Sequence, residues 1–252
     1  MPFFFFSNCV NCVVGVAAGT ASTNCATYKT STISSASSYA ALYGNWKYQY
    51  DKFNDKYWWI PISGDAAGIY ARTDKQRDAW FAPAGLNRGQ IKNVVKLAFS
   101  PNRAQRDIMY KSQVNPVVNF AADGPIIFGQ KTLQAKPSAF DRVDVRRLFI
   151  VLEKAISTAS RYFLFEKNTA FTRQQLVGMI EPFLRRVQGR QGIYEFHVEC
   201  TEINNPPAVI DANELVCDIY IQPTKTAEFI SLNFIATRTG VDFNEFIGKV
   251  QF

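Results

Sequence analysis

The sequence is poor in the residue types on which most catalytic sites depend. It contains a single histidine, His197, in 252 residues. No glycine-rich phosphate loop, nucleophile elbow or HExxH pair of zinc ligands is present. His197 lies between Glu195 and Glu199 in an alternating segment, where polar side chains are expected on the exposed face of a strand. We therefore expect no enzymatic activity and no cofactor.

Cysteines are few and form no repeated pattern. Their number is odd, which argues against a disulfide framework and predicts reduced thiols. Two of them have the C-x-x-C spacing of half a zinc site, but no second pair and no nearby histidine completes it, so we expect no metal. The five are Cys9, Cys12, Cys25, Cys200 and Cys217.

Long apolar runs are also missing. No stretch approaches the roughly 18 continuous apolar residues of a membrane-spanning helix. The opening "MPFFFFSNCVNCVVGVAAG" lacks the positively charged segment of a signal peptide, and Asn8 and Asn11 interrupt its apolar residues. We expect no membrane insertion.

Acidic residues are outnumbered by basic ones, and the excess is local. The chain has 28 Lys and Arg against 21 Asp and Glu, a formal net charge of +7. Residues 142–190 alone hold ten basic and four acidic residues, a net charge of +6. This concentration predicts an acidic partner, which could be nucleic acid, anionic lipid or another protein. The ten are Arg142, Arg146, Arg147, Lys154, Arg161, Lys167, Arg173, Arg185, Arg186 and Arg190.

Aromatic residues are plentiful, and in the first half of the chain they indicate strands. Between residues 39 and 64 they recur near period two, with Asn54–Asp55 as a plausible turn. Val94–Phe99 is predicted as a further strand. Asn115–Gly129 is predicted as two short strands around Asp123–Gly124, a strong hairpin dipeptide.

The basic segment contains two helical patterns. In the first, apolar residues recur at helical spacing from Val145 to Ala159, with Asp141 as the expected N-cap. The opposite face carries Arg146, Arg147, Lys154 and Arg161.

The second helix is expected to begin at an N-cap, Thr172. Gln175 would close a capping box, and Phe171 and Leu176 would form a hydrophobic staple. Pro182 is expected to kink this helix, and Gly189 and Gly192 to end it. Its predicted core face is Leu176, Ile180, Phe183, Leu184 and Val187.

Three further strands are predicted after the helices, at Ile193–Cys200, Glu214–Gln222 and Glu228–Ala236. The order of strands, two helices and strands predicts an α+β fold, a mixed β-sheet with two main helices packed on it, preceded by a small β-rich partial domain.

The basic helices admit three interpretations. Their charges could form an ordinary solvated face, bind nucleic acid, or dock onto an acidic protein surface. No zinc finger, helix-turn-helix glycine pattern or aromatic RNA-binding signature accompanies them. The aromatic residues fall on the core faces of the helices instead of alternating with the arginines, so spacing alone favours nucleic acid least.

A long series of motifs runs in order from about Tyr39 to Phe243. It consists of "WKYQYDKFNDKYWWIPISGDAAGIYARTD", "WFAPAGLNRGQIKNVVKLAFSPNRAQRDIMY", "NPVVNF", "FGQKT", "PSAFDRVDVRRLFIVLEKAI" and "VIDANELVCDIYIQPTKTAEFISLNFIATRTGVDF". Together these motifs resemble the C-terminal part of the contractile tail sheath proteins of T-even-like phages.

The resemblance implies a virion structural protein, assembled in the host cytoplasm, that stacks as hexameric rings around a tail tube and contracts to drive the tube through the host envelope. Its implied partners are other sheath subunits, the tube protein, and the baseplate and tail terminator proteins, with no direct contact to nucleic acid. A basic nucleic-acid-binding module is the alternative function.

The resemblance also implies two sets of contact residues. A helix of this domain contacts an acidic tube in relatives, and the matching helix here carries the candidates Arg173, Arg185, Arg186 and Arg190. Extended terminal arms add strands to neighbouring subunits, a form of strand addition to an open sheet edge. The candidates for this role are Val241, Phe243, Phe246, Val250 and Phe252.

The resemblance is weak before about Ser38. We therefore expect residues 1–78 to be a partial, β-rich remnant of a preceding sheath domain, 79–236 to be the sheath core domain and 237–252 to be the C-terminal arm. The chain would then be an N-terminally truncated or split product, and a separate chain could supply the N-terminal arm.

Overall fold

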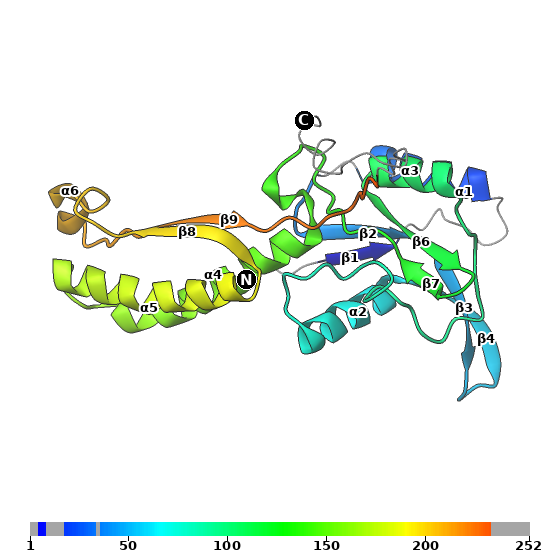
Figure 1. The fold of residues 1–252 in the computed structure, drawn as a ribbon, viewed down its shortest axis with the longest axis horizontal. Coiled ribbons are helices and arrows are strands. Elements are labelled where there is room, and N and C mark those ends of the chain that lie inside the picture. The colour runs from blue at the N-terminus through cyan, green and yellow to red at the C-terminus, as the bar shows by residue number, and fades with distance from the viewer. Residues whose placement is uncertain (1–4, 9–17, 34–35, 233–252) are drawn as a thin grey trace, which may run out of the picture.

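The computed structural model describes residues 5–8, 18–33 and 36–232. In chain order the helices and strands form a body, in which a sheet lies between helices, and an elongated lobe that extends from it (Figure 1). The elements of the body are β1 (Phe5–Asn8), α1 (Ala18–Thr27), β2 (Ala40–Gly44), β3 (Trp46–Asp51), β4 (Lys56–Pro61), α2 (Ser63–Gln76), β5 (Lys96–Leu97), α3 (Arg103–Lys111), β6 (Val114–Phe120) and β7 (Gly124–Ile127). The elements that follow are α4 (Val143–Ser160), α5 (Ala170–Gly189), β8 (Ile193–Glu199), α6 (Pro207–Asp211) and β9 (Asp218–Pro223).

The body is built on a four-stranded sheet in the order β1-β2-β6-β7. The β1–β2 and β2–β6 pairs are parallel, and β6–β7 is an antiparallel hairpin. Helix α2 covers one face of the sheet, and α1 and α3 cover the other (Figure 1). The hairpin confirms the turn predicted at Asp123–Gly124, where Gly124 has a φ of +78°.

The central strand β2 shows why both faces of this sheet need a cover. Ala41 and Tyr43 point into the core beneath α2, whereas Leu42, between them, points into the core beneath α1 and α3. Gly44 shares the face of Leu42, and a Cβ atom there would lie 2.6 Å from Cε of Met109. Glycine at this position therefore allows α3 to approach the strand closely.

A second sheet extends the body as a hairpin. Strands β3 and β4 pair from Trp46–Pro61 to Asp51–Lys56, and β5 adds to the other edge of β3. The turn predicted at Asn54–Asp55 is confirmed, with Asp55 at a φ of +51°. Only two residues of the strand predicted at Val94–Phe99 are in strand conformation.

The lobe has its own apolar core. The two-stranded antiparallel β8–β9 sheet packs on α4 and α5. The predicted core face of α5 is confirmed, since four of its members are buried and Phe183 packs beside them. Helix α5 continues through Pro182 as one 20-residue helix and ends at Gly189.

Helix α4 joins the two cores. Its first residue, Val143, is buried in the core of the body, and Leu148 and Leu152 belong to the core of the lobe. All six residues from Val143 to Leu148 are buried, so this end of the helix has no solvated face. The lobe is therefore attached to the body through a helix that is rooted inside it.

Both predicted helix starts are wrong, the first by one residue and the second by three. The N-cap of α4 is Arg142, without a side-chain cap, instead of Asp141. The N-cap of α5 is Thr169, whose hydroxyl oxygen accepts from the Thr172 amide. Phe171 is 69% exposed, so the expected staple with Leu176 does not form. The loop before α5 is tied through Asn168 to Glu214, a contact that local sequence signals could not indicate.

The structure also differs from the domain boundary expected after residue 78 and from the last predicted strand. The four-stranded sheet runs across the boundary expected after residue 78, because β2 pairs with β6. The strand predicted at Glu228–Ala236 is wrong over residues 228–232, which are neither helix nor strand; the rest of it lies outside the described residues. A strand pattern without a partner strand cannot form a ladder.

Removing a core side chain of the lobe should destabilise the protein strongly. Leu184 is fully buried, so Leu184→Ala should lower the free energy of unfolding by about 2–5 kcal/mol. The same change at the 65%-exposed Leu164 should cost less than about 0.5 kcal/mol. Urea unfolding of the two variants measures the difference, and equal losses would contradict the assigned core.

Candidate assembly surfaces

The arginines of α4 point into the protein. Arg147 Nη2 lies 2.5 Å from Oδ1 of Asp74, and its guanidinium stacks 4.7 Å from the ring centre of Tyr70. The Tyr70 hydroxyl lies 2.5 Å from that of Tyr43. Burial raises the pKa of both tyrosines, so both stay neutral next to the cation. Arg147 thus links α4 to α2 and to the central strand.

Arg146 is buried between two aromatic rings. Its guanidinium lies 3.8 Å from the ring centre of Phe140 and 4.2 Å from that of Tyr39, and Nη1 donates to the Tyr39 hydroxyl at 3.1 Å. Among the described residues no carboxylate forms an ion pair with Arg146, and its Nε atom has no hydrogen-bond partner. The two aromatic rings stabilise the buried positive charge of Arg146, as a carboxylate would otherwise do. Arg146 and Arg147 are therefore not part of a solvated basic face.

Two of the four predicted tube-facing arginines are engaged within the chain. Arg173 is buried, with Nη1 2.8 Å from Oδ1 of Asn168. Arg190 pairs with Asp78 at 2.8 Å, and its carbonyl oxygen accepts from Trp80 Nε1 at 3.0 Å. Arg190 therefore ties the end of α5 to residues 78–80.

The other two, Arg185 and Arg186, are exposed neighbours on α5. Arg185 pairs with Glu181 one helical turn away, at 3.3 Å. Within the described part of the chain, the Arg186 side chain makes no hydrogen bond or ion pair. Surface pairs of this kind contribute little to folding, so both guanidinium groups are available to a partner. We call Arg185 and Arg186 the α5 arginine pair.

Arg185, one member of the α5 arginine pair, borders a shallow, open hollow between α5 and β8. Its lining includes Glu181, Arg185, Glu195 and His197. His197 is exposed on β8 and stacks on Tyr220 at 6.3 Å between ring centres, as expected for the polar face of a strand. The hollow combines both signs of charge with little depth, which suits contact with a protein surface better than enclosure of a small molecule.

The described cysteines include no reactive group. Burial raises the pKa of Cys200 and raises that of Cys217 to about 12, so both stay protonated thiols. These two confirm the prediction of reduced thiols. Cys25 contradicts it, because it is disulfide-bonded; pairing by contact in space has no signal in cysteine spacing alone. Cys9 and Cys12 lie outside the described residues.

Neither a metal site nor a membrane span is found in residues 5–8, 18–33 and 36–232. No group of three or more histidine, cysteine or acidic side chains is arranged to hold a metal ion there, and no helix has the length and apolar character to cross a bilayer. All five predicted inter-subunit strand residues, Val241, Phe243, Phe246, Val250 and Phe252, lie outside the described residues.

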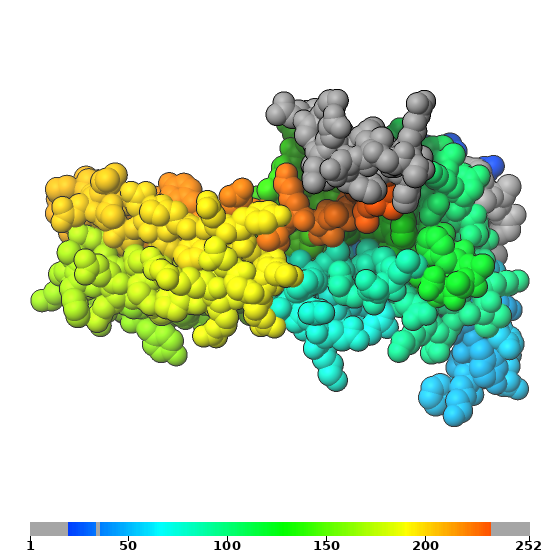
Figure 2. Space-filling view, in the orientation of Figure 1, coloured from blue at the N-terminus to red at the C-terminus, as the bar shows by residue number. Residues whose placement is uncertain are grey.

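The segment that leads to those five residues is described, and it lies on the body. We call residues 224–232 the strap. It leaves β9, returns from the lobe and crosses the surface of the body toward α3 (Figures 1 and 2). Phe229, Ile230 and Leu232 on the strap are each more than 70% exposed. An exposed apolar run of this kind is a candidate surface for contact with another molecule.

The body and the lobe together form a mixed α/β fold, and its described surface carries the exposed α5 arginine pair and the exposed apolar residues of the strap. Two family models match the sequence in succession: the phage tail sheath protein central domain over residues 8–133, and the phage tail sheath C-terminal domain over residues 135–237. The chain belongs to the phage tail sheath protein family.

Individual proteins that are similar to this chain are also tail sheath proteins. The chain is 51% identical over 213 residues to the tail sheath protein of Vibrio phage KVP40, and 49% identical over 213 residues to that of Enterobacteria phage T4. Each match covers 84% of this chain and 32% of the relative. The chain thus spans about a third of the length of the curated relatives it matches.

A solved structure has the same fold. The sheath of an extracellular contractile injection system (PVC) in its contracted state superposes with a TM-score of 0.79 at 24% identity, over 96% of this chain and 65% of that one. At this identity the likeness concerns the fold alone, and it confirms a mixed α/β sheath fold.

The arginines should differ in their effect on stability according to their burial. Arg147→Ala removes an ion pair and the stack on Tyr70, and should lower the free energy of unfolding by about 1–3 kcal/mol. Arg186→Ala should change it by less than about 0.5 kcal/mol. Chemical denaturation of the two variants tests this, and equal effects would refute the internal role of Arg147.

Proposed function

We propose that the chain is a structural subunit of a contractile phage tail sheath. It polymerises with other copies as stacked hexameric rings around a tail tube, and the lattice contracts to drive the tube through the host envelope. Its further partners are the baseplate and tail terminator proteins. It acts in the tail of the virion after assembly in the host cytoplasm, and it catalyses no reaction.

One observation carries this proposal: the sheath central and C-terminal domain matches follow one another and together span residues 8–237 with a single-residue gap. The described residues hold no cluster of metal ligands, and the sole histidine is exposed on a strand. Neither feature supports a catalytic function in place of a structural one. The division that we propose is between the body, with an apolar core on each face of its sheet, and the lobe, with a core of its own, joined by α4, instead of a boundary after residue 78. Residues 237–252 remain the proposed arm.

Two kinds of contact of different strength would serve this function. The α5 arginine pair offers exposed cations to an acidic tube surface, and exposed ion pairs are individually weak and easily exchanged. The C-terminal arm would pair with a neighbouring sheet through backbone hydrogen bonds, which persist while side-chain contacts change. A sheath that slides off its tube yet stays continuous needs both.

The alternative of a nucleic-acid-binding module is not favoured. Affinity for a phosphate backbone requires cations at the surface, and Arg146, Arg147 and Arg173 are buried within the chain. Arg142 and Arg190 are paired with acidic groups. The +6 of this segment is therefore largely neutralised or enclosed, which the spacing of the sequence could not reveal.

The proposal predicts assembly. Purified chain, alone and mixed with the tail tube protein, should form rings or tubes by negative-stain electron microscopy and sediment as large species. A monomer under both conditions at high concentration would overturn the sheath function. Affinity for DNA that falls steeply with salt would instead support the alternative.

The α5 arginine pair should matter for the tube and not for folding. Reversing both charges, Arg185→Glu with Arg186→Glu, should weaken tube binding about tenfold and reduce its salt dependence. The control is Lys154→Glu with Arg161→Glu, which makes the same change in charge at exposed positions of the lobe. Co-sedimentation with tubes at several salt concentrations distinguishes them, and equal losses would exclude a specific contact.

A further inference from the structure

The strap is attached at every second residue. The Thr224 hydroxyl donates to the carbonyl oxygen of Gln191 at 2.9 Å. The Thr226 hydroxyl donates to Oδ2 of Asp144 at 2.5 Å. The side chain of Glu228 makes the third and last of these attachments. This alternation is that of an extended chain with one face toward the protein.

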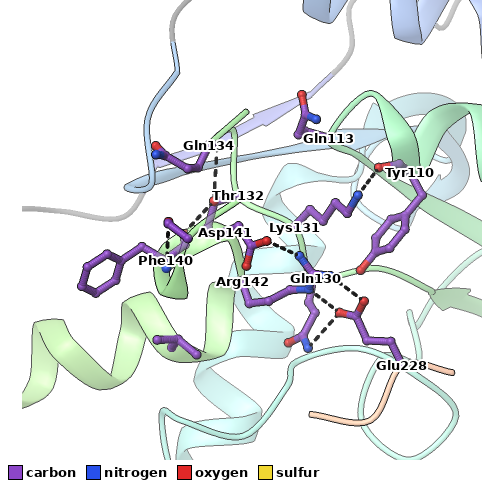
Figure 3. Close-up of polar contacts among 12 residues, drawn as sticks. Tyr110, Gln113, Gln130, Lys131, Thr132, Gln134, Phe140, Asp141, Arg142 and Glu228 are labelled. Atoms are coloured by element: carbon purple, nitrogen blue, oxygen red, sulfur yellow. Dashed lines mark hydrogen bonds and ion pairs between the residues drawn. The ribbon is translucent and has the colours of Figure 1, made fainter. Parts of the chain in front are cut away.

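Glu228 has the strongest attachment (Figure 3). Its carboxylate accepts two hydrogen bonds from Arg142, from Nε at 2.7 Å and from Nη2 at 3.0 Å, and a third from Gln130 Nε2 at 3.3 Å. Tyr110 faces the same carboxylate, and burial together with this negative charge raises its pKa. Paired hydrogen bonds between a guanidinium and a carboxylate fix direction as well as distance. We call Glu228, Arg142, Gln130 and Tyr110 the clasp.

The clasp joins segments that are far apart in the chain. Tyr110 comes from α3, Gln130 follows β7, and Arg142 is the N-cap of α4. Arg142 also pairs with Asp141 at 3.0 Å. The strap is thus fixed to the point at which the lobe is rooted in the body.

The attachment stops at Glu228. The Glu228 side chain is 16% exposed, whereas the next residue, Phe229, is 84% exposed. Of the described residues that follow, 229–232, none makes a hydrogen bond or an ion pair. Their sequence nevertheless has the pattern of a strand. The strap is therefore hydrogen-bonded to the protein up to Glu228 and makes no hydrogen bond over the described residues from Phe229 to residue 232.

We propose that Glu228 is the positioning residue of the C-terminal arm: the clasp fixes the root of the arm, so that the chain from residue 229 onward leaves the body from one place and in one direction. This inference rests on the proposed sheath function. A fixed root lowers the entropy lost when an arm pairs with a neighbouring sheet, and it raises the effective concentration of the strand at its acceptor. It also moves the functional start of the arm from residue 237 to residue 229.

The test is a double-mutant cycle on the full chain with Glu228→Gln, Arg142→Gln and the double variant. The control is Glu153→Gln, the same substitution at an exposed position of α4. One readout is the rate of tryptic cleavage after Lys225, which is exposed on the strap between two attachment points. The other is the critical concentration for assembly with the tube protein, measured beside the thermal unfolding midpoint.

Each single variant should be cleaved faster after Lys225 and should raise the critical concentration about tenfold, with the unfolding midpoint close to that of the wild type. The double variant should lose no more than the worse single variant, because both side chains act through one contact. Glu153→Gln should leave both readouts unchanged.

Two results overturn the inference while the sheath function stands: a Glu228→Gln variant that assembles like the wild type, or losses that add in the double variant. A wild-type chain that does not assemble with the tube protein removes the sheath function, and the inference with it. The wild-type measurement therefore separates the two failures.

Discussion

The structure depends on a helix that begins inside one core and ends in another. Val143 at the start of α4 is buried in the body, and Leu148 and Leu152 are buried in the lobe. Arg146 and Arg147 lie between these points, and a buried cation is tolerated only where rings or an acid compensate it. Tyr39, Phe140, Tyr70 and Asp74 supply that compensation. Two of the basic residues that suggested an acidic partner, Arg146 and Arg147, therefore hold the lobe on the body.

This arrangement fits the proposed sheath function, in which a subunit would have to transmit displacement. A lobe hinged on a loop would move independently of its body, whereas a lobe fixed by a buried helix carries its contacts with it when the subunit rotates. The strap returns over the same root, so α5, the body and the start of the proposed arm are all held in place near the beginning of α4. Contraction of a lattice of such subunits would need changes between copies and little change within each.

Sequence patterns predicted the parts of this fold that depend on residues close together in the chain. Helical periodicity located α4 and the core face of α5, and Asp123–Gly124 located a hairpin. Spacing could not show that Arg147 meets Asp74, 73 positions away, or that Arg142 meets Glu228, 86 positions away. Of the four proposed tube-facing arginines, Arg173 is buried and Arg190 is paired with Asp78, so only Arg185 and Arg186 are exposed without a contact to another element. The pattern at 228–232 is that of a strand, but these residues have no partner strand among the described residues and stay unpaired.

Cryo-electron microscopy of the assembled particle tests the central claim most directly. We expect Arg146, Arg147 and Arg173 to stay enclosed within their own subunit, while density from the tube meets the α5 arginine pair and a neighbouring sheet pairs with the chain beyond Glu228. Particles in which Arg185 and Arg186 face bulk solvent, or in which the C-terminal residues fold back onto their own subunit, would contradict it.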